Sequence, residues 1–269
     1  MIRAEEVENM SMNQQRLAEI KRRFEDTGIP LRLATEPFVR SSRWQIDRTA
    51  LLIDIRRVKR VPAPGEAVVL WPGAAEFDVV SADRRFHQVI LTTVERERRF
   101  LIRGRSASEP RWNLRTIPAD TRHFLVGRDE AHLFIARLPE AARSVAQAHH
   151  ILAPGTVLTS RREGHRVPRQ GEHFFLPTDG AERAAIALAL EEGAVPAPGI
   201  VHPSRDGHRV LRRGKPHRAT ECLVVAGRQF VRGVIRHPDH APLRLRDWMR
   251  PEVNREHEAA FARGVTWVD

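Results

Sequence analysis

Residues 230–248 read FVRGVIRHPDHAPLRLRDW, in which apolar and basic residues alternate on both sides of a His-Pro-Asp-His centre. Successive side chains of a strand point to opposite faces, so Leu243 and Leu245 would share one face and Arg244 and Arg246 the other. Proline and aspartate favour a turn between the two runs. The segment therefore predicts an antiparallel hairpin, with its tip at residues 237–242, that packs on one face and carries arginines on the other.

The hairpin belongs to the most basic part of the chain. Twelve arginine or lysine residues and only four acidic ones lie between Arg205 and Arg250, whereas the formal charge of all 269 residues is +11. Clustered cations bind polyanions because phosphates release condensed counterions on contact, and arginine binds phosphate through a planar fork. This concentration of charge predicts a nucleic-acid partner, with RNA favoured over DNA. The predicted contacts to nucleic acid are Arg166, Arg169, Arg209, Arg212, Arg213, Lys215, Arg218, Arg232, Arg236, Arg244 and Arg246.

A short repeat accompanies the basic region. Residues 164–171 read GHRVPRQG and residues 207–214 read GHRVLRRG, each preceded by an acidic residue. Glycine after an acidic residue suits a tight turn that leads into a strand. The repeat indicates either a structural duplication or a chance match in an arginine-rich chain.

The centre of the hairpin is also the densest group of potential metal ligands. His237, Asp239 and His240 supply two imidazoles and a carboxylate within four residues, a set that suits a divalent metal ion. Asn254 or Glu256 would complete such a site if the fold returned them there. The metal would activate water for hydrolysis. The competing interpretation is an exposed basic turn with no metal, and no other cofactor is expected.

Other catalytic patterns are sparse. The chain has no Gly-x-Ser-x-Gly elbow, no Walker loop and no Gly-x-Gly-x-x-Gly fingerprint, which argues against acyl transfer and nucleotide-dependent catalysis. The single cysteine, Cys222, rules out an internal disulfide and is expected to be a buried strand residue. In spacing, Arg143 and His149 resemble the catalytic pair of the HEPN ribonucleases, which implies that both would face a scissile phosphate. That resemblance covers two residues, which otherwise would form the polar edge of a helix.

The rest of the chain predicts an α+β protein, mainly antiparallel β-sheet or a small barrel with a few packing helices. Short β-branched runs fill residues 31–138. Helices are expected at residues 5–25, 139–152, 181–192 and 251–261, a loop at residues 196–199, and strands near residues 222–225 and 265–268. The expected domains are an N-terminal helix (1–28), a β-rich domain with a closing helix (29–153) and a basic α+β domain with the arginine-faced hairpin (154–269).

Three functions remain open at this point. An RNA-binding protein, for example a ribonucleoprotein component, is favoured over a metal-dependent nuclease or hydrolase and over a basic structural subunit of a protein assembly. Trp44, Trp112, Phe230 and Trp248 lie near arginines and would either stack on unpaired bases or anchor the core. No apolar run approaches the length of a membrane span and the N-terminus is acidic, so a cytoplasmic protein without a membrane partner is expected.

Overall fold

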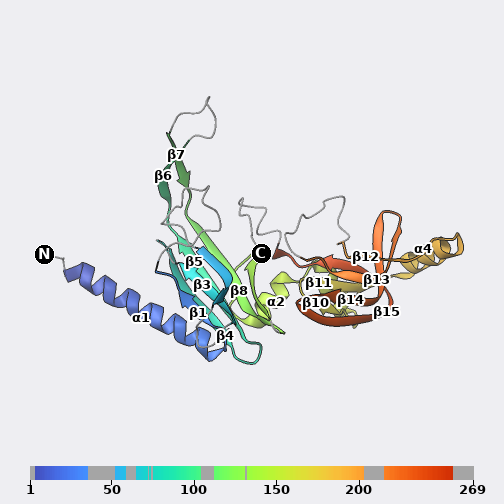
Figure 1. Ribbon diagram of the computed structural model, residues 1–269, viewed down its shortest axis with the longest axis horizontal. Coiled ribbons are helices and arrows are strands. Elements are labelled where there is room, and N and C mark those ends of the chain that lie inside the picture. The colour runs from blue at the N-terminus through green and yellow to red at the C-terminus, as the bar shows by residue number, and fades with distance from the viewer. Residues whose placement is uncertain are drawn as a thin grey trace. The chain divides into compact units, whose positions relative to one another are not determined.

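The structure is a computed structural model that describes residues 4–35, 52–58, 65–71, 73, 75–103, 112–130, 132–202 and 215–256. Helices and mainly antiparallel sheets confirm the α+β class (Figure 1). Within these residues no sheet closes into a barrel, so the open-sheet form of the prediction is the one observed.

The chain divides into two compact units. The first contains Met1–Arg128 and Leu133–Ala148, and the second contains Asp129–His132 and His149–Asp269. Helix α2 (Val145–Leu152) spans the division along the chain.

The first unit contains helix α1 (Ala4–Asp26) and three sheets, with strand orders β1-β3-β2, β4-β5-β8-β9 and β6-β7 among the described residues. β1 and β3 pair in parallel, whereas the other strand pairs of this unit with a described register are antiparallel. The strands are β1 (Leu31–Leu33), β2 (Leu52–Val58), β3 (Gly65–Trp71), β4 (Glu76–Asp83), β5 (Gln88–Glu95), β6 (Arg98–Arg103), β7 (Trp112–Ile117), β8 (Asp120–Asp129) and β9 (His132–Leu138).

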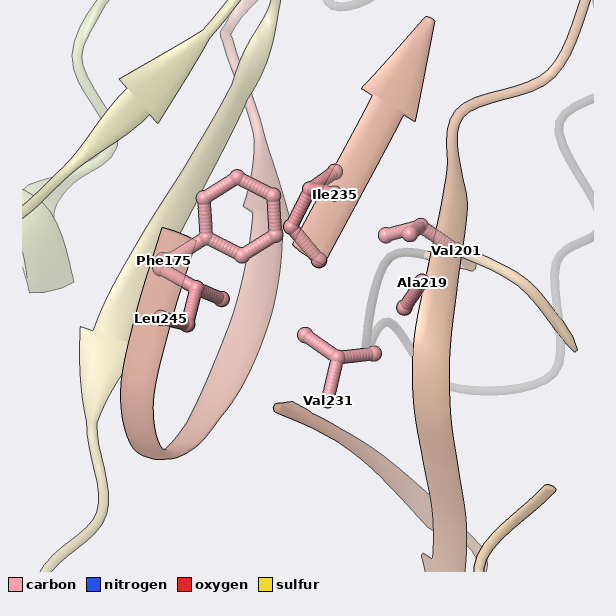
Figure 2. Close-up of a cluster of buried hydrophobic side chains, with 6 residues drawn as sticks. All are labelled: Phe175, Val201, Ala219, Val231, Ile235 and Leu245. Atoms are coloured by element: carbon pink, nitrogen blue, oxygen red, sulfur yellow. The ribbon is translucent and has the colours of Figure 1, made fainter. Parts of the chain in front are cut away.

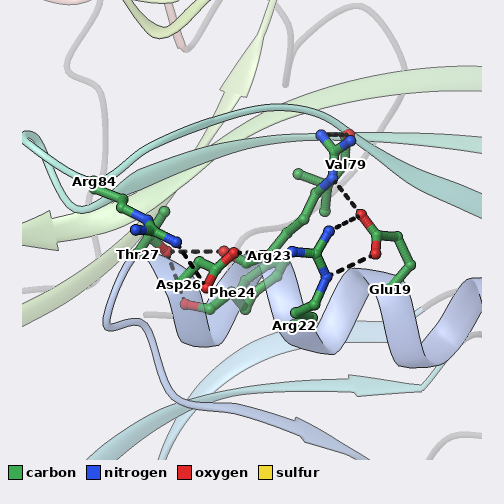
Figure 3. Close-up of polar contacts among 8 residues, drawn as sticks. All are labelled: Glu19, Arg22, Arg23, Phe24, Asp26, Thr27, Val79 and Arg84. Atoms are coloured by element: carbon green, nitrogen blue, oxygen red, sulfur yellow. Dashed lines mark hydrogen bonds and ion pairs between the residues drawn. The ribbon is translucent and has the colours of Figure 1, made fainter.

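Helix α1 packs through its C-terminal half. Ile20 and Phe24 are buried, and Arg23 Nη1 donates a hydrogen bond of 3.0 Å to the carbonyl oxygen of Val79 in β4 (Figure 3). The helix ends where the sequence predicts, because Gly28 has a φ of 74° and adopts the left-handed conformation that closes a helix. The helix is therefore held against the first unit by apolar burial and by a hydrogen bond from an arginine to a backbone carbonyl.

The second unit is built on a six-stranded sheet of order β10-β11-β15-β14-β13-β12, antiparallel throughout its described pairs (Figure 1). Its strands are β10 (Arg169–Gln170), β11 (His173–Pro177), β12 (Ala197–Ile200), β13 (Arg218–Val225), β14 (Arg228–His237) and β15 (His240–Val253). Its helices are α3 (Gly155–Arg162) and α4 (Gly180–Glu191). The predicted hairpin is thus confirmed as β14–β15.

The two faces of this sheet have different cores. On one face, Figure 2 shows the side chains of Phe175, Val201, Ala219, Val231, Ile235 and Leu245 converging into a buried cluster. On the other face, Ile186 of α4 packs with Leu223, Phe230 and Trp248. Helix α3 covers β11 through a third cluster that contains Val157 and Phe174. We call the side that carries the first cluster the core face and the side that α4 covers the outer face.

Two helix boundaries differ from the prediction. The helix expected from Pro139 begins only at Val145, because Ser144 Oγ accepts a hydrogen bond from the Gln147 N–H at 3.2 Å and so caps a later start. The predicted end of that helix, residue 152, lies just before Pro154-Gly155. This dipeptide does separate α2 from the next element, but α3 starts immediately at Gly155, a helix that the sequence did not predict. Proline is tolerated before the first helical residues because their N–H groups have no partner within the helix.

Two strand boundaries also differ. The expected loop at residues 196–199 contains β12, which lies at the sheet edge, where proline is tolerated. The expected helix after Pro251 is wrong for its first residues, because β15 continues to Val253. Pro251 lies beyond the last pair with β14, Val231 with Met249, and pairs only with β11.

Some expectations fall outside the described residues. These are the second repeat copy at 207–214, the remainder of the predicted helix after residue 256, and the closing strand at 265–268. Among the described residues, no helix has the length and hydrophobicity needed to cross a membrane.

Candidate functional site

Four arginines of the basic region lie on the outer face of the six-stranded sheet. Arg218 pairs across the strands with Arg236, and Val234 pairs with Arg244. Arg246 follows the buried Leu245, so strand alternation places it on the same side as Arg244. We call Arg218, Arg236, Arg244 and Arg246 the arginine face.

The arginine face is exposed to solvent. All four residues are exposed, and none has an ion-pair or hydrogen-bond partner in the part of the chain that the structure describes. A guanidinium group stays charged at physiological pH, so the four positive charges remain available to an external anion. The predicted alternation of leucine inside and arginine outside is confirmed for this hairpin.

Other arginines on the outer face are already engaged. Arg232 pairs with Glu221 at 2.6 Å and lies 4.7 Å from the ring centroid of Trp248. Arg250 contacts the buried carboxylate of Glu182 at 2.5 Å. Arg232 was predicted to contact nucleic acid, and its ion pair makes it less available than the arginine face.

The remaining predicted contacts are scattered. Arg166 and Lys215 are exposed, while Arg169 donates from Nε to the Gly171 carbonyl oxygen at 2.6 Å. Trp248 and Phe230 are buried, which excludes them as stacking platforms in this conformation. Arg209, Arg212, Arg213 and Trp44, and the side chain of Trp112, lie outside the described residues.

The predicted metal triad is only partly brought together. The ring centroids of His237 and His240 lie 5.0 Å apart. His237 Nε2 donates to the Lys215 carbonyl oxygen at 2.7 Å, and its Nδ1 accepts from the Asp239 N–H at 3.2 Å. These two hydrogen bonds engage both ring nitrogens of His237. The Asp239 carboxylate is half exposed and lies 3.8 Å from His132 Nε2.

A larger group of histidines lies around this turn on the core face, and it adds His173 and His217 to the predicted His237 and His240. We call His173, His217, His237 and His240 the histidine cluster. The ring centroid of His217 lies 4.5 Å from that of His173, 4.3 Å from that of His237 and 5.6 Å from that of His240. Burial, followed by the proximity of the His173 imidazole, lowers the pKa of His217 to about 3. His217 is therefore neutral at physiological pH.

Acidic side chains border the histidine cluster. Glu172 Oε1 lies 3.4 Å from His173 Nδ1 and 3.9 Å from His217 Nδ1. At the other side, Glu130 Oε2 accepts a hydrogen bond from the Ala241 N–H. Three sets of potential ligands have their donor atoms within 4.8 Å of one another: Glu172, His173 and His217; His217, His237 and His240; and Asp129, Glu130 and His240.

Sequence patterns gave only a weak signal for the missed residues. His173 begins the apolar run His-Phe-Phe-Leu, where a histidine is expected to be buried. His217 follows Lys215-Pro216 and resembles an exposed basic segment in the sequence, yet only 3% of its surface is exposed. The meeting of these two residues depends on sheet order, which local patterns do not encode.

Arg143 and His149 do not share a helix. Arg143 precedes the first residue of α2, whereas His149 lies within it. His149 Nδ1 is 3.4 Å from Arg169 Nη1, and burial lowers its pKa. The structure therefore does not place the pair at the regular helical spacing that the resemblance to HEPN ribonucleases assumed.

Comparisons of the chain with known protein families, with characterised proteins and with solved structures find no match.

Proposed function

We propose that the protein binds nucleic acid, RNA in preference to DNA, through the arginine face. The observation that carries this proposal is that Arg218, Arg236, Arg244 and Arg246 are all exposed on one face of a sheet and have no counterion within the described part of the chain. Binding costs each arginine part of its side-chain entropy, and each contact releases counterions from the phosphate.

The width of the arginine face favours RNA. Its members come from β13, β14 and β15, and neighbouring strands lie about 4.8 Å apart. The major groove of B-form DNA admits a helix or a two-stranded ribbon, whereas the minor groove of an RNA duplex is wide and shallow. A face three strands wide is better suited to the shallow groove, where it would contact phosphates and 2′-hydroxyls.

The contacts would be to the backbone rather than to the bases. Trp248 and Phe230 are buried, so the aromatic residues beside the arginines cannot stack on splayed bases without leaving the core. Phosphate contacts set position and affinity but carry no sequence information. We therefore expect weak sequence preference, as suits a protein that packs against a folded RNA in a ribonucleoprotein.

Binding titrations at several salt concentrations test the proposal. Fluorescence anisotropy would follow labelled hairpin RNA, single-stranded RNA and duplex DNA of equal length. Four phosphate contacts predict a slope of about −3 for the logarithm of the binding constant against the logarithm of salt concentration on single-stranded RNA. In the Arg244→Ala/Arg246→Ala double variant, the slope should fall to about −1.5 because two contacts are lost.

The matched control removes two charges from another element of the same unit. Arg161 and Arg162 are exposed on α3, and the Arg161→Ala/Arg162→Ala variant should keep the parental salt slope. If the salt slope fell equally in both double variants, RNA binding would depend on net charge and not on the arginine face. Tighter binding to duplex DNA than to RNA would refute the choice of nucleic acid, and a wild-type chain with no salt slope would refute nucleic-acid binding altogether.

A further inference from the structure

The sheet of the second unit brings together two histidine-bearing segments that its strand order separates. Strands β15 and β14 lie between β11 and β13, yet the rings of His173 and His217 are 4.5 Å apart. The sheet must therefore curve strongly at this end. We propose that Glu172, His173 and His217 form a binding site for a divalent transition-metal ion of the Zn²⁺ class.

The donor atoms already lie near the spacing that such an ion requires. Metal–ligand bonds of about 2.0–2.1 Å place the ligand atoms of a tetrahedral site about 3.3–3.5 Å apart. Glu172 Oε1 is 3.4 Å from His173 Nδ1 and 3.9 Å from His217 Nδ1, and each of the three residues offers one ligand atom within 4.8 Å of the others. Small side-chain rotations complete the set and leave a fourth position for water or a ligand.

Burial provides the second, independent observation. His173 and His217 are 5% and 3% exposed, and among the described residues neither His173 Nδ1 nor His217 Nε2, both buried, has a hydrogen-bond partner. Buried polar atoms without partners are rare and costly, so each calls for a specific explanation. A cation bound to His173 Nδ1 satisfies the first of these atoms directly.

The second orphaned atom fits an outer-shell contact. Metal-bound imidazoles usually donate their other N–H to a nearby acceptor. A Cβ atom built on Gly171 would lie 3.3 Å from His217 Nε2 and 2.6 Å from His240 Nε2, so both nitrogens face the space left by this glycine. With His217 bound to metal through Nδ1, its Nε2–H would donate toward His240. His240 is thus a positioning residue rather than a ligand.

The chemistry of the donors selects the ion and the site. Two imidazole nitrogens and one carboxylate oxygen suit Zn²⁺ and similar ions, whereas Mg²⁺ and Ca²⁺ require mostly oxygen ligands. The competing set of His217, His237 and His240 is weaker because hydrogen bonds occupy both nitrogens of His237. Of these two sets, the one formed by Glu172, His173 and His217 is therefore the better candidate.

Metal titration of the full chain without a histidine tag tests this site. Chelator-treated protein would be titrated with Zn²⁺ against a chromogenic competitor, and with Co²⁺ to record the visible absorption of a tetrahedral complex. We expect one ion per chain. Since loss of an outer-shell partner alone lowers affinity about 10–100-fold, loss of a ligand in Glu172→Gln should lower it at least about 100-fold.

Two further variants separate the possible sites. His240→Ala should weaken binding only about tenfold, as an outer-shell change does. His202→Ala removes an exposed histidine outside the cluster and should leave affinity unchanged. The proposal fails if the wild-type chain binds no Zn²⁺, or if His240→Ala abolishes binding while Glu172→Gln leaves it intact.

A measurement on the wild-type chain guards against misfolded variants. X-ray absorption of the Zn²⁺-loaded protein counts imidazole ligands directly, without any substitution. Two imidazoles with oxygen ligands support the proposed set. Three imidazoles, or a shell of oxygen alone, would overturn it.

Discussion

The six-stranded sheet places two kinds of basic side chain in opposite environments. Arginine and histidine are neighbours in sequence at His217-Arg218 and again at Arg236-His237, and strand alternation sends the histidines to the core face and the arginines to the outer face. Arginine keeps its charge and must stay solvated or paired, whereas a neutral imidazole tolerates burial. The same local pattern therefore produces a charged surface on one side and a group of potential metal ligands on the other.

The largest expected effect on stability comes from a substitution in the core of the six-stranded sheet that carries the two faces. Phe175 is fully buried in the core-face cluster, beside the start of the strand that carries His173 (Figure 2). Replacing Phe175 with alanine should destabilise the second unit by about 3–5 kcal/mol, through lost burial and the cavity left behind. Hydrogen exchange of the β14 and β15 amides, measured against urea concentration, would report the loss for this unit alone.

A matched substitution at the surface provides the control for Phe175→Ala. Val195 is 82% exposed, so Val195→Ala should change stability by less than about 0.5 kcal/mol. If Phe175→Ala lowered stability by no more than this, the core-face cluster would not be the main source of stability of the sheet.

The next prediction distinguishes arginines of the outer face that stabilise the fold from those available for binding. Arg250 contacts Glu182, whose side chain is only 7% exposed, so Arg250→Ala leaves a buried carboxylate with the more distant Arg228 at 3.5 Å. We expect a loss of about 2–3 kcal/mol in stability, because a charged hydrogen bond disappears and its partner stays buried. Urea denaturation measures this loss.

Arg244 is expected to contribute to RNA binding and not to stability. It is exposed and has no counterion among the described residues, so Arg244→Ala should change stability by less than about 0.5 kcal/mol. The same variant should weaken RNA binding, whereas Arg250→Ala should not. A loss of stability in Arg244→Ala as large as that in Arg250→Ala would contradict the distinction between structural and available arginines.

The parts of this fold that local sequence patterns specify were predictable. The β14–β15 hairpin follows from alternation over two short runs, and the inward Leu245 and outward Arg244 lie as expected. Its tip is tighter than expected: His237 already pairs with His240, so only Pro238 and Asp239 form the turn. With a turn of two residues, both strands extend further toward the tip than the residue types predicted.

The parts that depend on distant pairing were not predictable. His173 and His217 meet because β11 and β13 belong to one curved sheet, and no pattern within either segment encodes that order. Helix α3 was missed for a different reason, since Pro154-Gly155 is compatible with the end of one helix and the start of another. The predicted contacts Arg209, Arg212 and Arg213, and the duplication of the Gly-His-Arg-Val repeat, stay predictions.

The smallest effect concerns the one thiol, which shares the core face with the histidine cluster. Cys222 packs against the core-face cluster, and burial raises the pKa of its thiol. Since the thiolate is the reactive form, iodoacetamide should modify Cys222 more slowly in the folded chain than in urea at pH 8.

A raised folded-state pKa of the Cys222 thiol stabilises the fold below the ordinary thiol pKa, and that contribution is lost as pH rises through the folded-state value. Mass spectrometry of the alkylation rate across this alkaline range measures the shift. Equal alkylation rates in the folded and unfolded chains would show that the core face does not shield Cys222. The contrast between a buried core face and a solvated outer face would then fail at this residue.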